Sequence, residues 1–237
     1  MRVLTAIFWA ILLLAWPPKA HAQTTSPPPV AGLLPWYAGV QLANHAFEIV
    51  VPGSASGLTG VHPYQLTVGR YLTPRWAVQV GYSAYHFLLE STAEGTNEKG
   101  QPMSRHLYAE DWVKAVPVLM RRHLTRNVAH RMQFQGLAGA TLVRYRDKVE
   151  VVNRENGAVV WQSSSNRSAM NAYLTLGPAA SYRLGRHLEA CFDFLLTKNL
   201  HAIDRTFSTQ QLNSILGFQH GWNLGLRYQF DVKKRAE

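Results

Sequence analysis

The sequence has little cysteine, little charge and, past its first residues, no long apolar run. It holds one cysteine, Cys191, so it can form no internal disulfide. Charged residues make up 16% of its 237 residues, whereas 47% are hydrophobic. Beyond residue 22 no apolar stretch approaches about 18 residues, which excludes a transmembrane helix there. The many apolar residues must therefore be distributed in a pattern other than long runs.

The first 22 residues have the features of a cleaved export signal. Arg2 supplies a positive start, and residues 3–16 form an apolar run that Pro17-Pro18 interrupts. Ala20-His21-Ala22 is a small-x-small cleavage site, so we expect cleavage before Gln23. The alternative is a membrane anchor helix, which needs about 17–25 apolar residues.

Beyond the signal, apolar and polar residues alternate in segments of strand length. Residues 221–230 show this best, since Trp222 and Leu224 alternate with Asn223 and Gly225. Successive side chains of a strand point to opposite faces, so such a segment has one apolar and one polar face. Proline and an in-phase lysine leave the facing of one segment, 108–124, ambiguous. We expect eight strands: 36–47, 64–72, 76–87, 108–124, 131–146, 171–184, 187–198 and 221–230.

The connections between these segments alternate in length. Residues 73–75, 125–127 and 184–186 are short turns; residues 51–62, 88–107, 147–167 and 199–216 are long and polar. An eight-stranded antiparallel up-and-down transmembrane β-barrel has this layout, with short turns and both termini in the periplasm. We further expect residues 147–167 to extend a hairpin beyond the membrane surface. A soluble barrel carrying a lipid-like ligand is the alternative.

The barrel segment resembles the small bacterial outer-membrane β-barrels of the OmpA/OmpX-like family. The resemblance covers residues 36–230 and is carried by Trp36-Tyr37-Ala38-Gly39, the turn at Tyr71–Trp76 and the aromatic strand ending at Phe230. It implies location in the outer membrane after export. It also implies that the aromatic residues of the last strand are read by the outer-membrane assembly machinery: Trp222, Tyr228 and Phe230.

Two segments flank this barrel. Residues 23–35 contain Ser26-Pro27-Pro28-Pro29 and are expected to be a flexible, proline-rich lead-in. Residues 231–237 are expected to be a short basic periplasmic tail.

The polar faces of the strands predict a polar network in the barrel lumen. Its strands 187–198 and 221–230 are neighbours, so Glu189 or Asp193 could pair with Arg227. The interpretations are a polar path or gate, or a filled interior whose charges must be paired because isolated buried charge is costly. The predicted members are Glu189, Asp193, Arg227, Asn223, Gln229, Gln133 and Gln135.

Two further groups are expected at the membrane boundaries. Trp36, Trp76 and Tyr82 fit interfacial aromatic girdles. A basic rim on the short-turn side would contact anionic phospholipid headgroups or simply keep the turns soluble. Its members are Arg75, Arg121, Arg122, Arg126 and Arg186.

The sequence says less about the function of the protein than about its fold. The net charge of +10 falls to +8 without Arg2 and Lys19, and the export signal makes nucleic acid an improbable partner. The histidines and serines match no metal-ligand or hydrolase spacing, so we expect no enzymatic activity and no cofactor. Lipid A modification, which enzymes built on the same scaffold perform, is the alternative. We expect a structural or surface-interaction role, with outer-membrane lipids as partners and any extracellular ligand bound by the long loops. A narrow pore for small or hydrophobic solutes is the alternative within the membrane class.

Overall fold

The computed structural model describes residues 36–45, 47–49, 57–59, 64–96, 100–127, 130–200, 214–215 and 218–230. The expected signal peptide, lead-in and tail therefore lie outside the described residues. None of these described segments forms a helix long and apolar enough to cross a membrane. The strands are β1 (Trp36–His45), β2 (Phe47–Ile49), β3 (Gly57–Thr59), β4 (Tyr64–Thr73), β5 (Trp76–Thr96), β6 (Pro102–His123), β7 (Met132–Glu155), β8 (Ala158–Arg183), β9 (Leu188–Asn199), β10 (Ser214–Ile215) and β11 (Phe218–Phe230).

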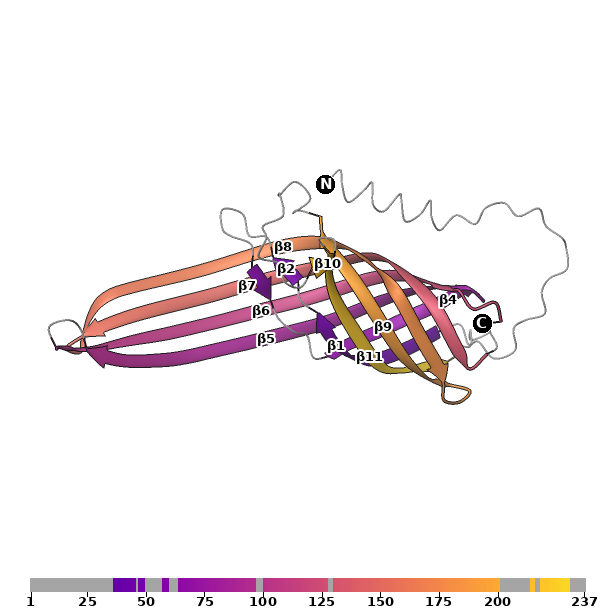
Figure 1. Ribbon diagram of the computed structural model, residues 1–237, viewed down its shortest axis with the longest axis horizontal. Coiled ribbons are helices and arrows are strands. Elements are labelled where there is room, and N and C mark those ends of the chain that lie inside the picture. Colours follow the sequence, from indigo (N-terminus) through magenta and orange to yellow (C-terminus); the bar gives the residue numbers. More distant parts are fainter. Residues whose placement is uncertain are drawn as a thin grey trace, which may run out of the picture.

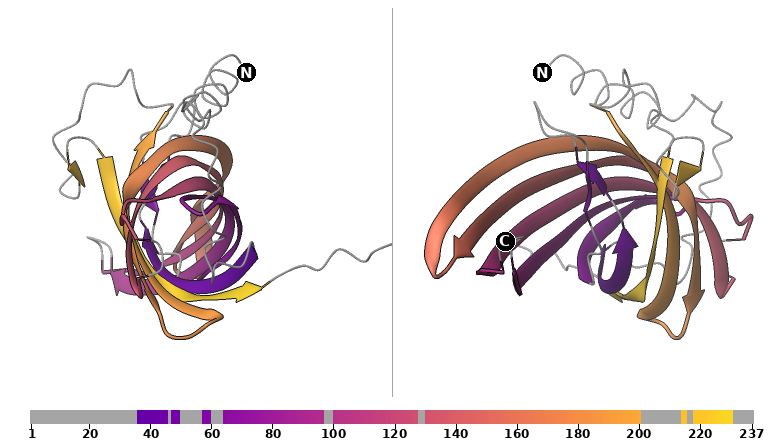
Figure 2. Two further views of the ribbon diagram at one scale, coloured as in Figure 1. Left: turned by 90° about the vertical axis from the view of Figure 1, so that its right-hand side faces the viewer. Right: turned by 60° about the vertical axis from the view of Figure 1, so that its left-hand side comes forward.

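Eight of these strands form a closed antiparallel barrel. They follow the order β1-β4-β5-β6-β7-β8-β9-β11, and β1 pairs with β11 to close the ring, from Trp36 opposite Phe230 to His45 opposite Gly221. Viewed almost along its axis, the barrel is a ring of strands (Figure 2, left). The two-residue β10 adds to β11 outside this ring. The predicted eight-stranded all-β fold is confirmed.

The facing of β6, ambiguous in the sequence, is settled by its burial. Val113 and Ala115 are buried in the barrel, whereas Trp112 and Lys114 are exposed on the outer wall. Pro117 faces inward, and the β5–β6 pairing is interrupted beside it although the register is the same on either side. The missing N–H of proline therefore causes a local gap in the ladder and not a bulge.

Four strands continue well beyond the barrel as an open antiparallel sheet. The ends of β5, β6, β7 and β8 form this sheet, which we call the protruding sheet (Figure 1). Residues 147–167 extend the β7–β8 hairpin beyond the barrel, with Asn156 and Gly157 at its tip in positive-φ conformations, and its position beyond a membrane surface stays a prediction. Asn-Gly is a strong sequence signal for such a tight hairpin turn.

The prediction of a long loop over residues 88–107 was wrong. Residues 88–96 belong to β5, and residues 102–107 belong to β6, with Thr96 opposite Pro102. A sheet in water needs no apolar face, so this part of the hairpin lacks the apolar–polar alternation by which strands are recognised.

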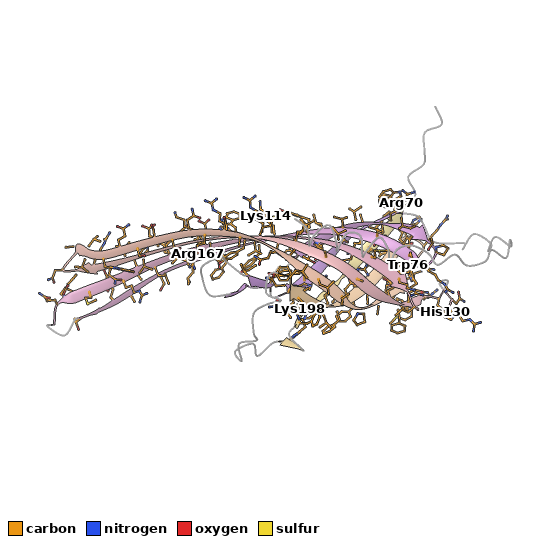
Figure 3. All side chains as sticks on the ribbon, turned by 90° about the horizontal axis from the view of Figure 1, so that it is seen from above. Arg70, Trp76, Lys114, His130, Arg167 and Lys198 are labelled. Carbon is orange, nitrogen blue, oxygen red and sulfur yellow. The ribbon has the colours of Figure 1, made fainter. Side chains whose placement is uncertain are left out.

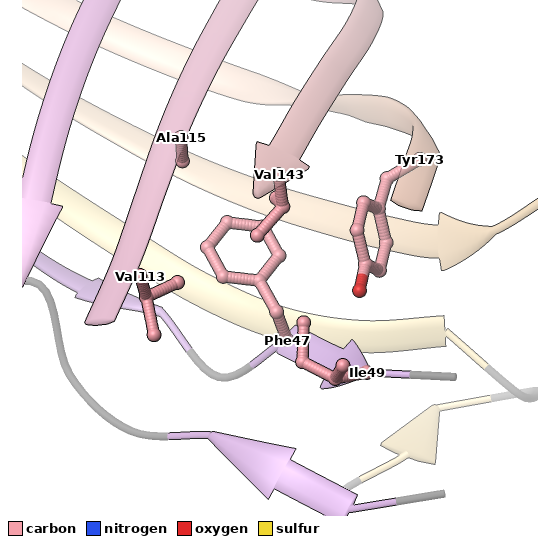
Figure 4. Close-up of a cluster of buried hydrophobic side chains, with 6 residues drawn as sticks. All are labelled: Phe47, Ile49, Val113, Ala115, Val143 and Tyr173. Atoms are coloured by element: carbon pink, nitrogen blue, oxygen red, sulfur yellow. The ribbon is translucent and has the colours of Figure 1, made fainter. Parts of the chain in front are cut away.

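A short hairpin covers the mouth of the barrel. β2 and β3 pair from Phe47 opposite Thr59 to Ile49 opposite Gly57. Residues 57–59 therefore form a strand within residues 51–62, which were expected to be a loop from the Gly and Ser content of that segment. Phe47 and Ile49 are buried, and the ring of Phe47 lies edge-on to Tyr173 at 5.1 Å between centroids. We call this cluster the apolar plug (Figure 4): Phe47, Ile49, Val113, Ala115, Val143 and Tyr173.

Candidate functional site

Asp193 lies at the centre of the barrel interior and is fully buried. Its Oδ1 accepts hydrogen bonds from Nη1 of Arg121 at 3.0 Å and from Nη2 of Arg227 at 3.3 Å. Its Oδ2 accepts from Nη2 of Arg121 and, at 3.1 Å, from Nε2 of Gln41. One carboxylate from β9 thus connects strands β1, β6 and β11 across the lumen.

The second carboxylate of the interior, Glu189, completes the charge balance. It stands opposite Arg227 in the β9–β11 register, and its Oε2 lies 3.8 Å from Nη1 of Arg227. Both pairs expected from the sequence, Glu189–Arg227 and Asp193–Arg227, are therefore present. Two guanidinium groups and two carboxylates make the network neutral, as burial of charge requires.

Arg121 was wrongly assigned to the basic rim. It is buried at 2% exposure and paired with Asp193. Arg121 lies two residues after the buried Leu119 and therefore points into the barrel as Leu119 does. Arg122 faces outward and covers the ring of Trp76 at 5.3 Å. The alternation along residues 108–124 could have predicted that Arg121 points inward, but the sequence left open which face of this strand is buried. The other rim residues are exposed near the short turns: Arg75, Arg122, Arg126 and Arg186.

The remaining residues of the predicted lumen network are all buried, but they do not form one cluster. Gln135 accepts from Nη1 of Arg121 at 3.1 Å, and Gln229 lies 3.5 Å from Glu189. Gln133 instead donates to backbone carbonyl groups of the adjacent turn. Asn223 stands nearer the mouth, 3.1 Å from His45. Arg121 and Gln41 also belong to the network, although they were not among its predicted members.

Side chains fill the barrel between this network and the mouth. A cavity of about 10 Å³ lies there, lined by residues such as Ser83, Thr141 and Thr175. Such a volume holds about one water molecule. The apolar plug closes the space above it. This packing matches the filled interior considered from the sequence better than a polar path.

The outer wall of the barrel is apolar. Val40, Leu66 and Leu224, on three adjacent strands, are each about half exposed although they are hydrophobic. A soluble protein has the opposite arrangement, with apolar side chains inside. Closure, strand number, polar interior and apolar exterior together decide the fold. The chain has the fold of the small outer-membrane β-barrels.

Comparison with known proteins adds fold-level likeness only. No family model and no curated protein sequence matches the chain. Its barrel is similar to Ail, the attachment invasion locus protein of Yersinia pestis, at 11% identity and a TM-score of 0.46, covering 84% of this chain and 99% of that one. It is also similar to the N-terminal β-barrel domain of Pseudomonas aeruginosa OprF, at 12% identity and a TM-score of 0.42, covering 82% and 97%.

Aromatic side chains mark both ends of the apolar outer wall of this outer-membrane-type barrel. Trp36 and Trp76 lie near the short turns, and Arg70 covers the ring of Trp36 at 5.2 Å. Tyr82 and Trp222 lie toward the mouth and are 46% and 38% exposed. The predicted assembly residues Trp222, Tyr228 and Phe230 all face outward on β11. Their recognition by assembly machinery stays a prediction.

The protruding sheet has two open edges. Pairing of β4 with β5 ends at Ser83, and pairing of β8 with β9 begins at Tyr173. Among the described strands, residues 84–96 of β5 and 158–166 of β8 therefore pair with a neighbouring strand on one side only. The edge of β8 includes Val159, Val160 and Trp161, each about half exposed. This edge presents unpaired backbone groups beside apolar side chains.

Ionisable groups at the base of the protruding sheet differ in their surroundings. Burial raises the pKa of Asp147, although Arg167 at 3.4 Å acts in the opposite direction. Hydrogen bonds from Trp112 and then Tyr108 lower the pKa of Glu110. The surroundings of Asp147 therefore disfavour its ionised form relative to water, whereas those of Glu110 favour the carboxylate.

Proposed function

We propose that the chain is an outer-membrane protein that holds the protruding sheet outside the cell as an interaction surface. The observation that carries this proposal is the length of the sheet beyond the barrel. On β8, residues 158–172 precede the first pairing with β9. At about 3.3 Å per residue, this portion is roughly 50 Å long.

Membrane insertion is supported by the position of apolar and polar groups. The outer wall would face lipid, and the buried network would stay within the lumen. The short turns with Arg75, Arg122, Arg126 and Arg186 would lie in the periplasm. The alternatives fit less well, because a lipid carrier or pore requires free space where this barrel is packed. We propose no catalytic role.

The mode of interaction that the edge of β8 favours is addition of an extended segment from another protein. Residues 158–166 carry no charge and no proline. Natural proteins usually block exposed edges with lysine, proline or bulges, because an open edge pairs with other strands. A partner strand would obtain main-chain hydrogen bonds from β8, and side chains such as Trp161 would provide selectivity.

Two measurements test the proposal. Electrophoresis of the outer-membrane fraction, with and without boiling, should show the protein there with a heat-dependent change in mobility. Hydrogen exchange of residues 158–166 should slow when an alternating Thr-Val peptide is added as a probe. Ser163→Lys with Ser164→Lys should abolish this protection, whereas Ser104→Lys, on a strand paired on both sides, should not. Equal exchange with and without peptide in all variants would contradict the edge mechanism.

A further inference from the structure

A basic groove lies on the outer wall where the barrel continues into the protruding sheet. Its volume is about 290 Å³, and Trp112 and Lys114 of β6 and Arg144 and Arg146 of β7 line it. Figure 3 shows Lys114 on the outside, between Trp76 at the turn end and the far end of the sheet. We call these four residues the basic groove.

The three cationic side chains of the basic groove lie close enough to repel one another when no anion is bound. Lys114 stands directly opposite Arg144 in the β6–β7 register, and Arg146 follows on the same face. Like charges directly opposite each other destabilise a sheet. Within the described part of the chain, these three side chains make no ion pair with a carboxylate. An anion bound among them would remove the repulsion.

The nearest carboxylate on the same face of β6 is already engaged. Glu110 accepts hydrogen bonds from Nε1 of Trp112 at 2.9 Å and from the hydroxyl of Tyr108 at 3.0 Å, and it lies 3.0 Å from Nε2 of His86. The ring of His86 stacks on Trp112 at 3.9 Å between centroids. These contacts fix the indole at one end of the groove and leave the guanidinium and ammonium groups for another ligand.

The groove also lies at the height of a membrane surface. Arg122 over Trp76 marks the turn end of β6, and Trp112 lies about ten residues further along the same strand. With a rise of about 3.3 Å per residue and a tilt of about 40°, this separation is roughly 25 Å, the height of the apolar band of an outer-membrane barrel. Between Lys114 of the groove and Arg122, the outward side chains of β6 are apolar: Val116, Val118 and Met120.

We propose that the basic groove binds the phosphate groups of a phosphorylated glycolipid in the outer leaflet of the membrane. Arg144 and Arg146 would hold phosphate oxygens through paired N–H donors, and Lys114 would act as a point charge. Trp112 would lie at the boundary between acyl chains and sugar, where indole rings are favoured. This inference rests on the proposed insertion in the outer membrane.

The test compares lipids that differ only in phosphate. The mature protein, refolded in a neutral detergent, is titrated with diphosphorylated lipid A, with dephosphorylated lipid A and with inorganic phosphate, and its thermal unfolding is followed. The diphosphorylated lipid should raise the unfolding temperature most. Lys114→Gln with Arg144→Gln and Arg146→Gln should weaken its apparent binding at least about tenfold, since each lost charged hydrogen bond contributes at this scale.

A matched variant at the other end of the barrel provides the control. Arg75→Gln with Arg122→Gln and Arg126→Gln removes the same charge from the short-turn side and should leave lipid binding within about twofold. Without lipid, the groove variant should be at least as stable as the unmodified protein, because repulsion has been removed. If the triple groove variant does not fold, the single change Lys114→Gln serves in its place.

Several outcomes would overturn the inference. They are equal binding of both lipids, unchanged binding by the groove variant, or full reproduction of the effect by inorganic phosphate, which would indicate a free-anion site. Failure of the proposed function is distinguishable, since it would appear as absence of the unmodified protein from the outer-membrane fraction. A protein that inserts normally but ignores lipid phosphate would contradict only the basic groove assignment.

Discussion

Replacing Asp193 by asparagine should destabilise the barrel strongly while preserving its shape. The change removes one negative charge from an interior that contains Arg121 and Arg227 balanced by Asp193 and Glu189. Asparagine can still accept on one side, but two guanidinium groups would then share a single carboxylate. Breaking a buried ion pair by removing one partner costs about 3–5 kcal/mol, and we expect a loss in this range.

The assay is equilibrium unfolding in urea of the barrel inserted in lipid vesicles, followed by tryptophan fluorescence. Adding Arg121→Gln to Asp193→Asn restores neutrality, because Arg227 and Glu189 remain. The double variant should therefore lose less than the sum of the two single variants, with a coupling of about 2 kcal/mol or more.

Asp147→Asn is the matched control. Asp147 is also buried, but its partner Arg167 is 43% exposed and burial raises the pKa of Asp147. A raised folded-state pKa means that the group stabilises the fold below its unfolded pKa and loses that contribution as pH rises through the folded pKa. Neutralising Asp147 at pH 7 should therefore change stability by less than about 1 kcal/mol. A loss below about 1 kcal/mol for Asp193→Asn, or simple additivity in the double variant, would refute the reasoning about the network.

Three further predictions follow from other parts of the structure. Phe47→Ala should release the mouth hairpin at a cost of roughly 3 kcal/mol, seen as faster hydrogen exchange in β2; unchanged exchange would contradict the role of the plug. Planar-bilayer recordings should show no steady conductance, because the interior is packed around a cavity of about 10 Å³; a stable open state would contradict it. The lowered pKa of Glu110 implies stabilisation present above its unfolded pKa and lost as pH falls through the folded pKa. Trp112 fluorescence should report this acid transition, and Glu110→Gln should abolish it.

The barrel strands were predictable because the membrane imposes a strict pattern. Lipid outside and polar groups inside force side chains to alternate, so β9 and β11 could be recognised by their period of two. Because these two strands are neighbours, the sequence alone places Glu189 and Asp193 near Arg227. Asn156-Gly157 also carried a turn signal that matches the tip of the longest hairpin.

The features that escaped prediction lie where this pattern weakens. Residues 88–96 and 102–107 have no buried face, so alternation does not reveal their strands. The mouth hairpin depends on Phe47 meeting Tyr173, a contact between residues far apart in sequence. To predict the role of Arg121, one must know which face of β6 points inward, and Pro117 and Lys114 made this ambiguous. To predict the basic groove, one must know the β6–β7 register, which places Lys114 opposite Arg144.

The most direct test of the central claim is labelling of intact cells with a membrane-impermeant maleimide. The native Cys191 is buried in the barrel and gives little background. Ser163→Cys in the protruding sheet should be labelled in intact cells. Arg186→Cys in a short turn should be labelled only after the outer membrane is permeabilised. Labelling of Arg186→Cys alone, or equal labelling of both in intact cells, would contradict an inserted barrel that displays its protruding sheet outside the cell.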